Sequence, residues 1–135
     1  MTHLGARLAY VAARLDYEID VVAAHEAVAA GAAVLVDTRR LESWQHGHIA
    51  GAVHLPKTEV ASRVETLPRD RTLIVYGWGP GCNGATSTAR VLLEAGLDVR
   101  ELLGGYEYWA RNGFDIETAE GVSRQVRDPL VTAES

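Results

Sequence analysis

One stretch of the chain has the residue types and the spacing of an anion-binding loop. Gly77-Trp78-Gly79-Pro80-Gly81-Cys82-Asn83-Gly84 follows an apolar run and precedes a helical pattern that starts near Ala85. Its glycines allow turns that aim successive backbone N–H groups inward, and the helix that follows adds its positive N-terminal end. Such amides form an anion-binding cradle. The residues predicted to form it are Trp78, Gly79, Pro80, Gly81, Asn83, Gly84 and Ala85.

Cys82 lies inside this loop and is the single cysteine of the chain. A thiolate at a helix N-terminus is favoured by the helix dipole and is a ready nucleophile. The alternative is that Cys82 is a small packing residue without chemistry. The loop is neither a phosphate-binding P-loop nor a dinucleotide fingerprint, because the Gly-Lys-Ser/Thr ending and the required glycine spacing are absent.

A second charged group follows another apolar run. Ala32-Ala33-Val34-Leu35-Val36 ends at Asp37, and Arg39 comes two residues later. Ligands of parallel sheets bind beyond the carboxyl ends of strands, so we expect Asp37 and Arg39 to border the same pocket, with Arg39 attracting an anion. The alternative is a structural pair that fixes the end of the strand.

Three histidines, His46, His48 and His54, are the remaining candidates for a metal site. No cysteine or carboxylate accompanies them at ligand spacing, and one cysteine excludes both an internal disulfide and a multi-cysteine metal site. We expect neither a metal nor a cofactor.

The elements that must position these residues alternate between strands and helices. Buried strands are predicted at 32–37, 72–76 and 99–103, and a short extended piece at 53–56. Helices are predicted from Asp20 to Gly31, at 41–45, from Thr58 to Leu67, at 85–94 and after Gly104-Gly105. A polar tail is predicted over 118–135. This alternation is typical of an α/β fold with a mainly parallel sheet.

An additional helix is predicted at 3–16. Leu4, Leu8, Val11, Ala12 and Leu15 fall on one stripe, while Arg7 and Arg14 face water. The stripe packs either on its own domain or on a second copy of the chain.

Composition narrows the class of protein. The chain has 135 residues, 47% of them hydrophobic, and a net charge of −5, which suits one globular domain. It has no block of basic residues, no apolar run near the roughly 18 residues of a membrane span, and no signal-peptide pattern. We expect a cytoplasmic protein without nucleic-acid or membrane partners.

Three ordered motifs resemble the rhodanese-like domain family. The first runs from Asp37-Thr38-Arg39 through Glu42 and Trp44 to Gly47-His48-Ile49-Ala50-Gly51-Ala52-Val53-His54-Leu55-Pro56; the second is Val75-Tyr76 with its loop and helix; the third is Leu103-Gly104-Gly105 with Trp109 and Gly113. The resemblance implies a twisted, mainly parallel five-stranded sheet flanked by helices, in one domain over 1–135 with its core at about 19–114. It also implies sulfur transfer through a cysteine persulfide, with a small sulfur-containing anion as donor and a thiol acceptor.

The chain departs from the family at the nucleophile. Catalytic members resembling this loop have cysteine directly after the strand, where this sequence has Gly77. Three interpretations are open: a natural homologue without catalysis, a deliberate replacement of cysteine, or transfer of the nucleophilic role to Cys82. We therefore expect a sulfurtransferase scaffold that is inactive or weak. The alternative is a non-catalytic module that binds an anion or presents Trp78 to a protein partner.

Overall fold

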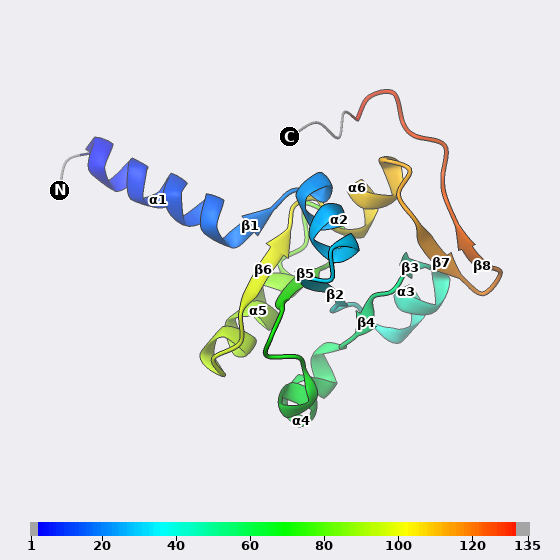
Figure 1. Cartoon of the computed structure of the whole chain (residues 1–135), viewed down its shortest axis with the longest axis horizontal. Helices are drawn as coiled ribbons and strands as arrows, with labels where there is room; N and C mark the ends of the chain where they lie inside the picture. The colour runs from blue at the N-terminus through cyan, green and yellow to red at the C-terminus, as the bar shows by residue number, and fades with distance from the viewer. Residues whose placement is uncertain (1–2, 132–135) are drawn as a thin grey trace.

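The computed structural model describes residues 3–131, and its centre is a five-stranded parallel sheet (Figure 1). The strand order is β1-β6-β5-β2-β4, and every neighbouring pair is parallel. The strands are β1 (Glu18–Ile19), β2 (Ala33–Asp37), β4 (Val53–His54), β5 (Thr72–Tyr76) and β6 (Val99–Leu102). The predicted parallel α/β sheet is confirmed.

Helices cover both faces of this sheet, because alternate residues of its central strands point to opposite sides. On one face, Leu35 and Ile74 pack with α2 (Val21–Ala29) and α6 (Gly105–Arg111). On the other face, Val36, Leu73 and Val75 pack with α5 (Gly84–Glu94) and α4 (Val60–Arg63). Strands buried on both faces explain the unbroken apolar runs in the sequence.

Local signals in the sequence mark the ends of these helices. The side chain of Asp20 accepts a hydrogen bond from the Ala23 N–H at 2.8 Å and caps α2, as predicted. The short helix α3 spans Leu41–His46. The segment predicted as one helix capped by Thr58 is instead a 3-10 turn (Lys57–Glu59), then α4, then a second 3-10 turn (Val64–Thr66), and Thr58 caps none of them.

A second, smaller sheet was not predicted. It contains β3 (His48–Ile49), β7 (Ile116–Thr118) and β8 (Gly121–Ser123), all antiparallel. The segment predicted as a tail from residue 118 therefore begins with a hairpin. Beyond it, Asp128 binds Arg111 of α6 at 2.8 Å, which holds this segment on the domain. Residues 132–135 of the predicted tail lie outside the described residues.

The first helix, α1 (His3–Tyr17), extends away from the rest of the domain (Figure 1). None of its residues is buried. The stripe predicted from the sequence is present on the helix, but it does not pack on its own domain.

Candidate functional site

The two chemically promising segments meet at one edge of the sheet. β2 and β5 are neighbours, and Asp37 lies in register with Tyr76. Immediately after β2, the backbone N–H and the hydroxyl of Thr38 donate to the Tyr76 carbonyl at 3.2 and 3.0 Å. The loop that starts at Gly77 therefore leaves the sheet beside the Asp37-Thr38-Arg39 segment.

Asp37 and Arg39 bind each other. Asp37 is fully buried, and its carboxylate accepts three hydrogen bonds from the Arg39 guanidinium at 2.7–3.1 Å and one from the Arg39 backbone N–H. The guanidinium also donates to the Gly47 carbonyl at 2.6 Å and lies 4.4 Å from the centre of the Tyr106 ring. These contacts engage Nε and Nη2 of Arg39 within the protein, and neither residue lines the cavity beside Gly77.

This pair also sets the charge state of its surroundings. Burial lowers the pKa of Arg39, but the hydrogen bonds and the negative charge of Asp37 outweigh it and raise that pKa overall. Burial, with the nearby Asp37 charge, raises the pKa of Tyr76 well above its usual range. The phenol is thus neutral, and its oxygen accepts from the Ile49 N–H at 3.1 Å. The geometry is that of a structural ion pair.

The loop after β5 is held by its carbonyl groups. Gly77 and Trp78 accept from the backbone N–H groups of Tyr106 and Glu107, in the first turn of α6, both at 3.0 Å. Gly105 makes this approach feasible: its φ is +62°, and a Cβ there would lie 2.7 Å from the Gly77 carbonyl oxygen. The Gly104-Gly105 motif therefore allows the first turn of α6 to contact the loop.

The backbone N–H groups of the loop are left available. Across the part of the chain described, the N–H groups of Trp78, Gly79, Gly81 and Asn83 have no hydrogen-bond acceptor. Cys82 N–H closes a turn by donating to Gly79 at 3.1 Å. Unpaired donors ahead of α5 are what an anion cradle requires, and anion binding by this loop stays a prediction.

Cys82 lies next to the position that Gly77 leaves empty. Its Sγ is 3.4 Å, and its Cβ 3.8 Å, from where a Cβ would stand on Gly77. The Gly84 N–H, at the start of α5, lies 3.5 Å from this sulfur. The thiol is exposed to solvent. Residues 78–82 thus fold back and bring a sulfur atom into contact with the position where a side chain of residue 77 would begin.

A cavity of about 140 Å³ opens between this loop and β6. Gly77, Cys82 and Gly105 line it on the loop side, and Glu18 and Glu101 on the other. Glu101 accepts from the Tyr17 hydroxyl and from Thr86 of α5, each at 2.8 Å. Burial raises the pKa of Tyr17, which keeps it a donor. Sequence reasoning missed both glutamates, which are register partners on β1 and β6.

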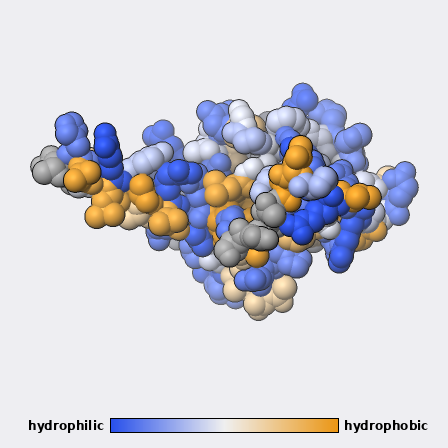
Figure 2. Space-filling model, turned by 90° about the horizontal axis from the view of Figure 1, so that it is seen from above, coloured by the Kyte–Doolittle hydropathy of each residue, from blue (hydrophilic) through white to orange (hydrophobic). Residues whose placement is uncertain are grey.

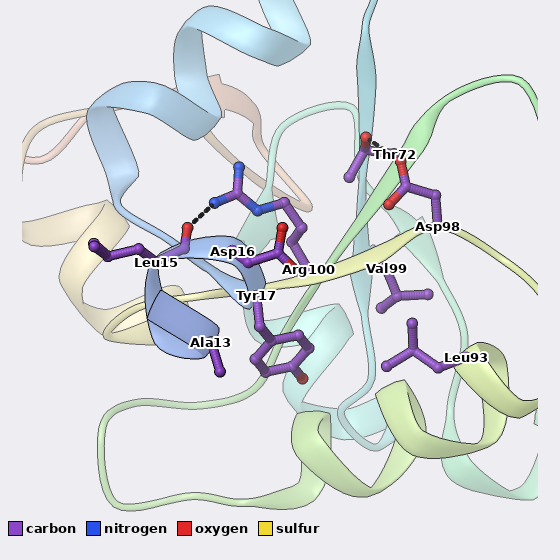
Figure 3. A pocket seen from close by; sticks show the side chains of 9 residues that line it. All are labelled: Ala13, Leu15, Asp16, Tyr17, Thr72, Leu93, Asp98, Val99 and Arg100. Carbon is purple, nitrogen blue, oxygen red and sulfur yellow. Dashed lines mark hydrogen bonds between the residues drawn. The ribbon is translucent and has the colours of Figure 1, made fainter. Parts of the chain in front are cut away.

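Other predicted residues lie outside this cavity. Trp78 is 57% exposed and does not fold over the domain's own apolar surface. His48 and His54 stack on the two faces of Trp44, with ring centroids 3.4 and 4.7 Å apart, and their ring nitrogens bind backbone carbonyls. A larger cavity of about 650 Å³, at the amino ends of β5 and β6 beneath α1, lies away from the loop (Figure 3).

The described residues contain neither a metal-ligand cluster nor a membrane-spanning helix. Among residues 3–131, no cluster of three or more His, Cys, Asp or Glu side chains could hold a metal ion. Within the same residues, no helix has the length and apolar character to cross a membrane.

Comparison with known proteins agrees with the fold. A family model for the rhodanese-like domain matches residues 20–112. A thiosulfate sulfurtransferase, GlpE of Pseudomonas entomophila, is 37% identical over 97 residues, which cover 70% of this chain and 85% of that protein.

Two further similar proteins are a longer transcriptional regulator and a solved structure of nearly the same extent. The HTH-type transcriptional regulator Rv0324 of Mycobacterium tuberculosis is 36% identical over 88 residues, and this chain spans only 39% of its length. The crystal structure of the BH2092 protein from Bacillus halodurans superposes with a TM-score of 0.78 at 30% identity, over 88% of this chain and 89% of that one. Together with the family match, these similarities show that the chain belongs to the rhodanese-like domain family.

Proposed function

We propose that this protein is a slow sulfurtransferase of the rhodanese type in which Cys82 carries the sulfur. One observation supports the proposal above all others: the Cys82 Sγ lies 3.4 Å from the Cβ position of Gly77. Of the interpretations of Gly77 open from the sequence, this contact favours transfer of the nucleophilic role to Cys82. The relationship to GlpE sulfurtransferases supplies the reaction class.

The reaction has two balanced steps. The Cys82 thiolate attacks the outer sulfur of thiosulfate, the sulfur–sulfur bond of the donor breaks, and sulfite leaves with the bonding electrons. The resulting persulfide is then attacked at its outer sulfur by a thiophile such as cyanide. Thiocyanate leaves, and the thiolate is restored. The Gly84 N–H beside the sulfur and the unpaired loop amides support the negative charge in both steps.

The charge around the cavity explains why we expect a low rate. Glu18 and Glu101 line the space next to Cys82, and the loop itself carries no Lys or Arg. Glu18 is partly neutralised by Arg14 at 2.7 Å, but Arg39, the nearest predicted anion-binding residue, is held by Asp37. A dianion entering this cavity therefore meets repulsion that weakens its binding.

The test compares this chain with Cys82→Ser, a replacement of nearly equal size without a thiol. Each is incubated with thiosulfate and cyanide while thiocyanate release is followed, and intact masses are taken after thiosulfate alone. We expect the natural thiol to gain one sulfur atom and to release thiocyanate above the protein-free rate. Cys82→Ser should lose both signals.

Two results would overturn the proposal. Equal turnover by Cys82→Ser would exclude Cys82 as the carrier. The second result is no turnover and no mass gain in the unmodified chain, with turnover in Gly77→Cys. It would mean that the loop supports sulfur transfer but that this chain lacks the nucleophile. The binding-module alternative, for which the exposed Trp78 is the supporting feature, would then take precedence.

A further inference from the structure

We propose that α1 is a dimerisation helix, and that its partner is α1 of a second copy of this chain in antiparallel orientation. The proposal is independent of the sulfur chemistry. It starts from four large side chains on one stripe of the helix: Leu4, Leu8, Val11 and Leu15 are 74%, 70%, 49% and 74% exposed. Figure 2 shows a row of hydrophobic side chains along the projecting helix.

A helix of this length needs a packing partner. α1 has 15 residues, and isolated helices of about 12–15 residues are marginal in water even when rich in alanine. Most helical stability in proteins comes from burying an apolar face. The described part of the chain buries no residue of α1, so we infer that a second molecule supplies the stabilising surface.

The base of the helix is nevertheless fixed. The Arg100 guanidinium donates to the carbonyls of Leu15 and Glu18 at 3.0 and 2.7 Å, and Tyr17 donates to Glu101 at 2.8 Å. Figure 3 shows Leu15 pointing away from the side on which Tyr17 packs. The domain thus holds α1 out at a defined angle, with the stripe facing away from the face that Tyr17 anchors.

The spacing of the stripe identifies the partner. The four residues are separated by four, three and four positions, a pattern that reads the same in both directions. A two-fold axis at the middle of the helix therefore places Leu4 opposite Leu15 of the second copy and Leu8 opposite its Val11. Isologous contacts of this kind are what a symmetric dimer uses. Such spacing is also that of a coiled-coil seam.

Antiparallel pairing also suits the rest of the molecule. Because α1 projects from one end of the domain, the two domains would lie at opposite ends of the helix pair and would not collide (Figure 1). Arg7 and Arg14 lie on one flank of the stripe, and the charge of Arg14 is balanced by Glu18 at 2.7 Å.

The area predicts a weak dimer. Each of the four side chains exposes on the order of 100 Å². Two copies with their flanking groups would bury about 1,000 Å² in total, which is the lower limit for a specific interface. We therefore expect dissociation in the micromolar range rather than an obligate dimer.

The first experiment measures molar mass by sedimentation from micromolar to millimolar protein. The variants are Leu8→Glu, in the middle of the stripe, and Ala6→Glu, which puts the same charge on the opposite side of the same helix. We expect the unmodified chain and Ala6→Glu to change from monomer to dimer with concentration, and Leu8→Glu to remain monomeric. A monomer at all concentrations, or dimerisation of Leu8→Glu, would overturn the proposal.

Orientation is tested by cross-linking in a Cys82→Ser background. Leu8→Cys and Val11→Cys proteins are mixed and oxidised. Antiparallel pairing predicts that the mixed disulfide dimer forms in preference to either homodimer. Preferential cross-linking of Leu8→Cys with itself would show parallel pairing and would reject the seam described above.

Discussion

The carboxyl ends of β2 and β5 are neighbours, but one carries charged side chains that pair with each other and the other carries uncharged groups that stay unpaired. The end of β2 has the charged side chains, Asp37 and Arg39, and these satisfy each other inside the protein. The end of β5 has a loop without Lys, Arg, Asp or Glu, yet it keeps backbone donors and a thiol available.

This difference shows that a charged residue at a sheet edge is not by itself a binding group. The Arg39 side chain is only 8% exposed and is committed to a buried partner, so it stabilises the frame. The reactive potential lies instead in groups that folding leaves unpaired. Substitutions at the two strand ends should therefore separate stability from activity.

Asp37→Asn should produce the largest effect. Removing one partner of a buried ion pair leaves an uncompensated charge and costs about 3–5 kcal/mol of unfolding free energy. Sulfur transfer per folded molecule should change little, because Asp37 does not reach the cavity at Cys82. Urea unfolding and the sulfur-transfer assay measure the two quantities.

Glu42→Gln is the matched control for that prediction. Glu42 and Arg40 form an exposed pair at 3.8 Å, with side chains 77% and 85% accessible. Its loss should change the unfolding free energy by less than about 0.5 kcal/mol. If Asp37→Asn were as mild as Glu42→Gln, or abolished transfer in folded protein, the structural role assigned to the pair would be wrong.

Gly105→Ala tests the other strand end and should be the next largest. Its φ of +62° disfavours a side chain, and the new Cβ would lie 2.7 Å from the Gly77 carbonyl oxygen and 3.0 Å from the Gly79 nitrogen. Strain and overpacking together should cost about 2–3 kcal/mol. Because the contact displaces the loop, we expect sulfur transfer to be lost as well.

Gly31→Ala separates strain from contact. Gly31 has a similar φ of +73°, but nothing lies within 4 Å of its Cβ position. It should cost only about 1 kcal/mol and leave transfer unchanged. Equal loss of transfer in the two variants would mean that the Gly105 contact does not position the loop.

Gly77→Cys should change stability less than Gly105→Ala does, and its effect on sulfur transfer should depend on whether the thiols are reduced or oxidised. The new Cβ would make ordinary contacts with Cys82 and would lie 3.8 Å from its Cβ, the usual separation in disulfides. We expect faster transfer under reducing conditions and a reversible loss on oxidation as the two thiols join. Intact mass with and without reductant detects the bond; activity that is indifferent to oxidation would place Cys82 elsewhere.

The sequence predicted those parts of the fold that depend on local pattern. The strand 72–76 was predicted with the residues of β5, because the apolar run that follows Thr72 is typical of a strand in a sheet buried on both faces. The α2 cap was predicted from Asp20 for a similarly local reason. The strand pair β3–β7 was missed because its strands are only two and three residues long and pair residues far apart in the chain.

The site was predicted by location but not by arrangement. Motif order placed the loop, Asp37 and Arg39 at one sheet edge. The partners of Arg39, however, include Gly47 and Tyr106, and no periodicity reports such contacts. The place of Cys82 depends on the conformation of a five-residue glycine-rich turn. Glu101 lies in a strand that was predicted for its buried apolar residues, and Glu18 lies in a two-residue strand that was not predicted, so no sequence pattern pointed to either carboxylate.

The smallest effect should come from an Arg–Asp pair that resembles Asp37–Arg39 but lies at the surface. Arg111 binds Asp128 through two nitrogens at 2.8 and 3.1 Å, and Asp128 also accepts from the Leu130 N–H at 2.9 Å. The Leu130 N–H first, and Arg111 second, lower the pKa of Asp128. Asp128→Asn should loosen the segment after residue 124, although the backbone N–H of residue 128 still donates to the Arg111 carbonyl at 2.9 Å. It should leave the thermal midpoint unchanged, unlike Asp37→Asn.

The pH dependence follows from the direction of that shift. A carboxyl whose pKa is lower in the folded state adds stability above its unfolded value of about 3.9, and this is lost as pH falls through the folded value. The contact should therefore persist at pH 5 and open only below about pH 4. The Leu130 amide resonance, followed by NMR during acid titration, should report this opening before the sheet unfolds. Opening near neutral pH, or an identical titration in Asp128→Asn, would show that the carboxylate does not hold the segment.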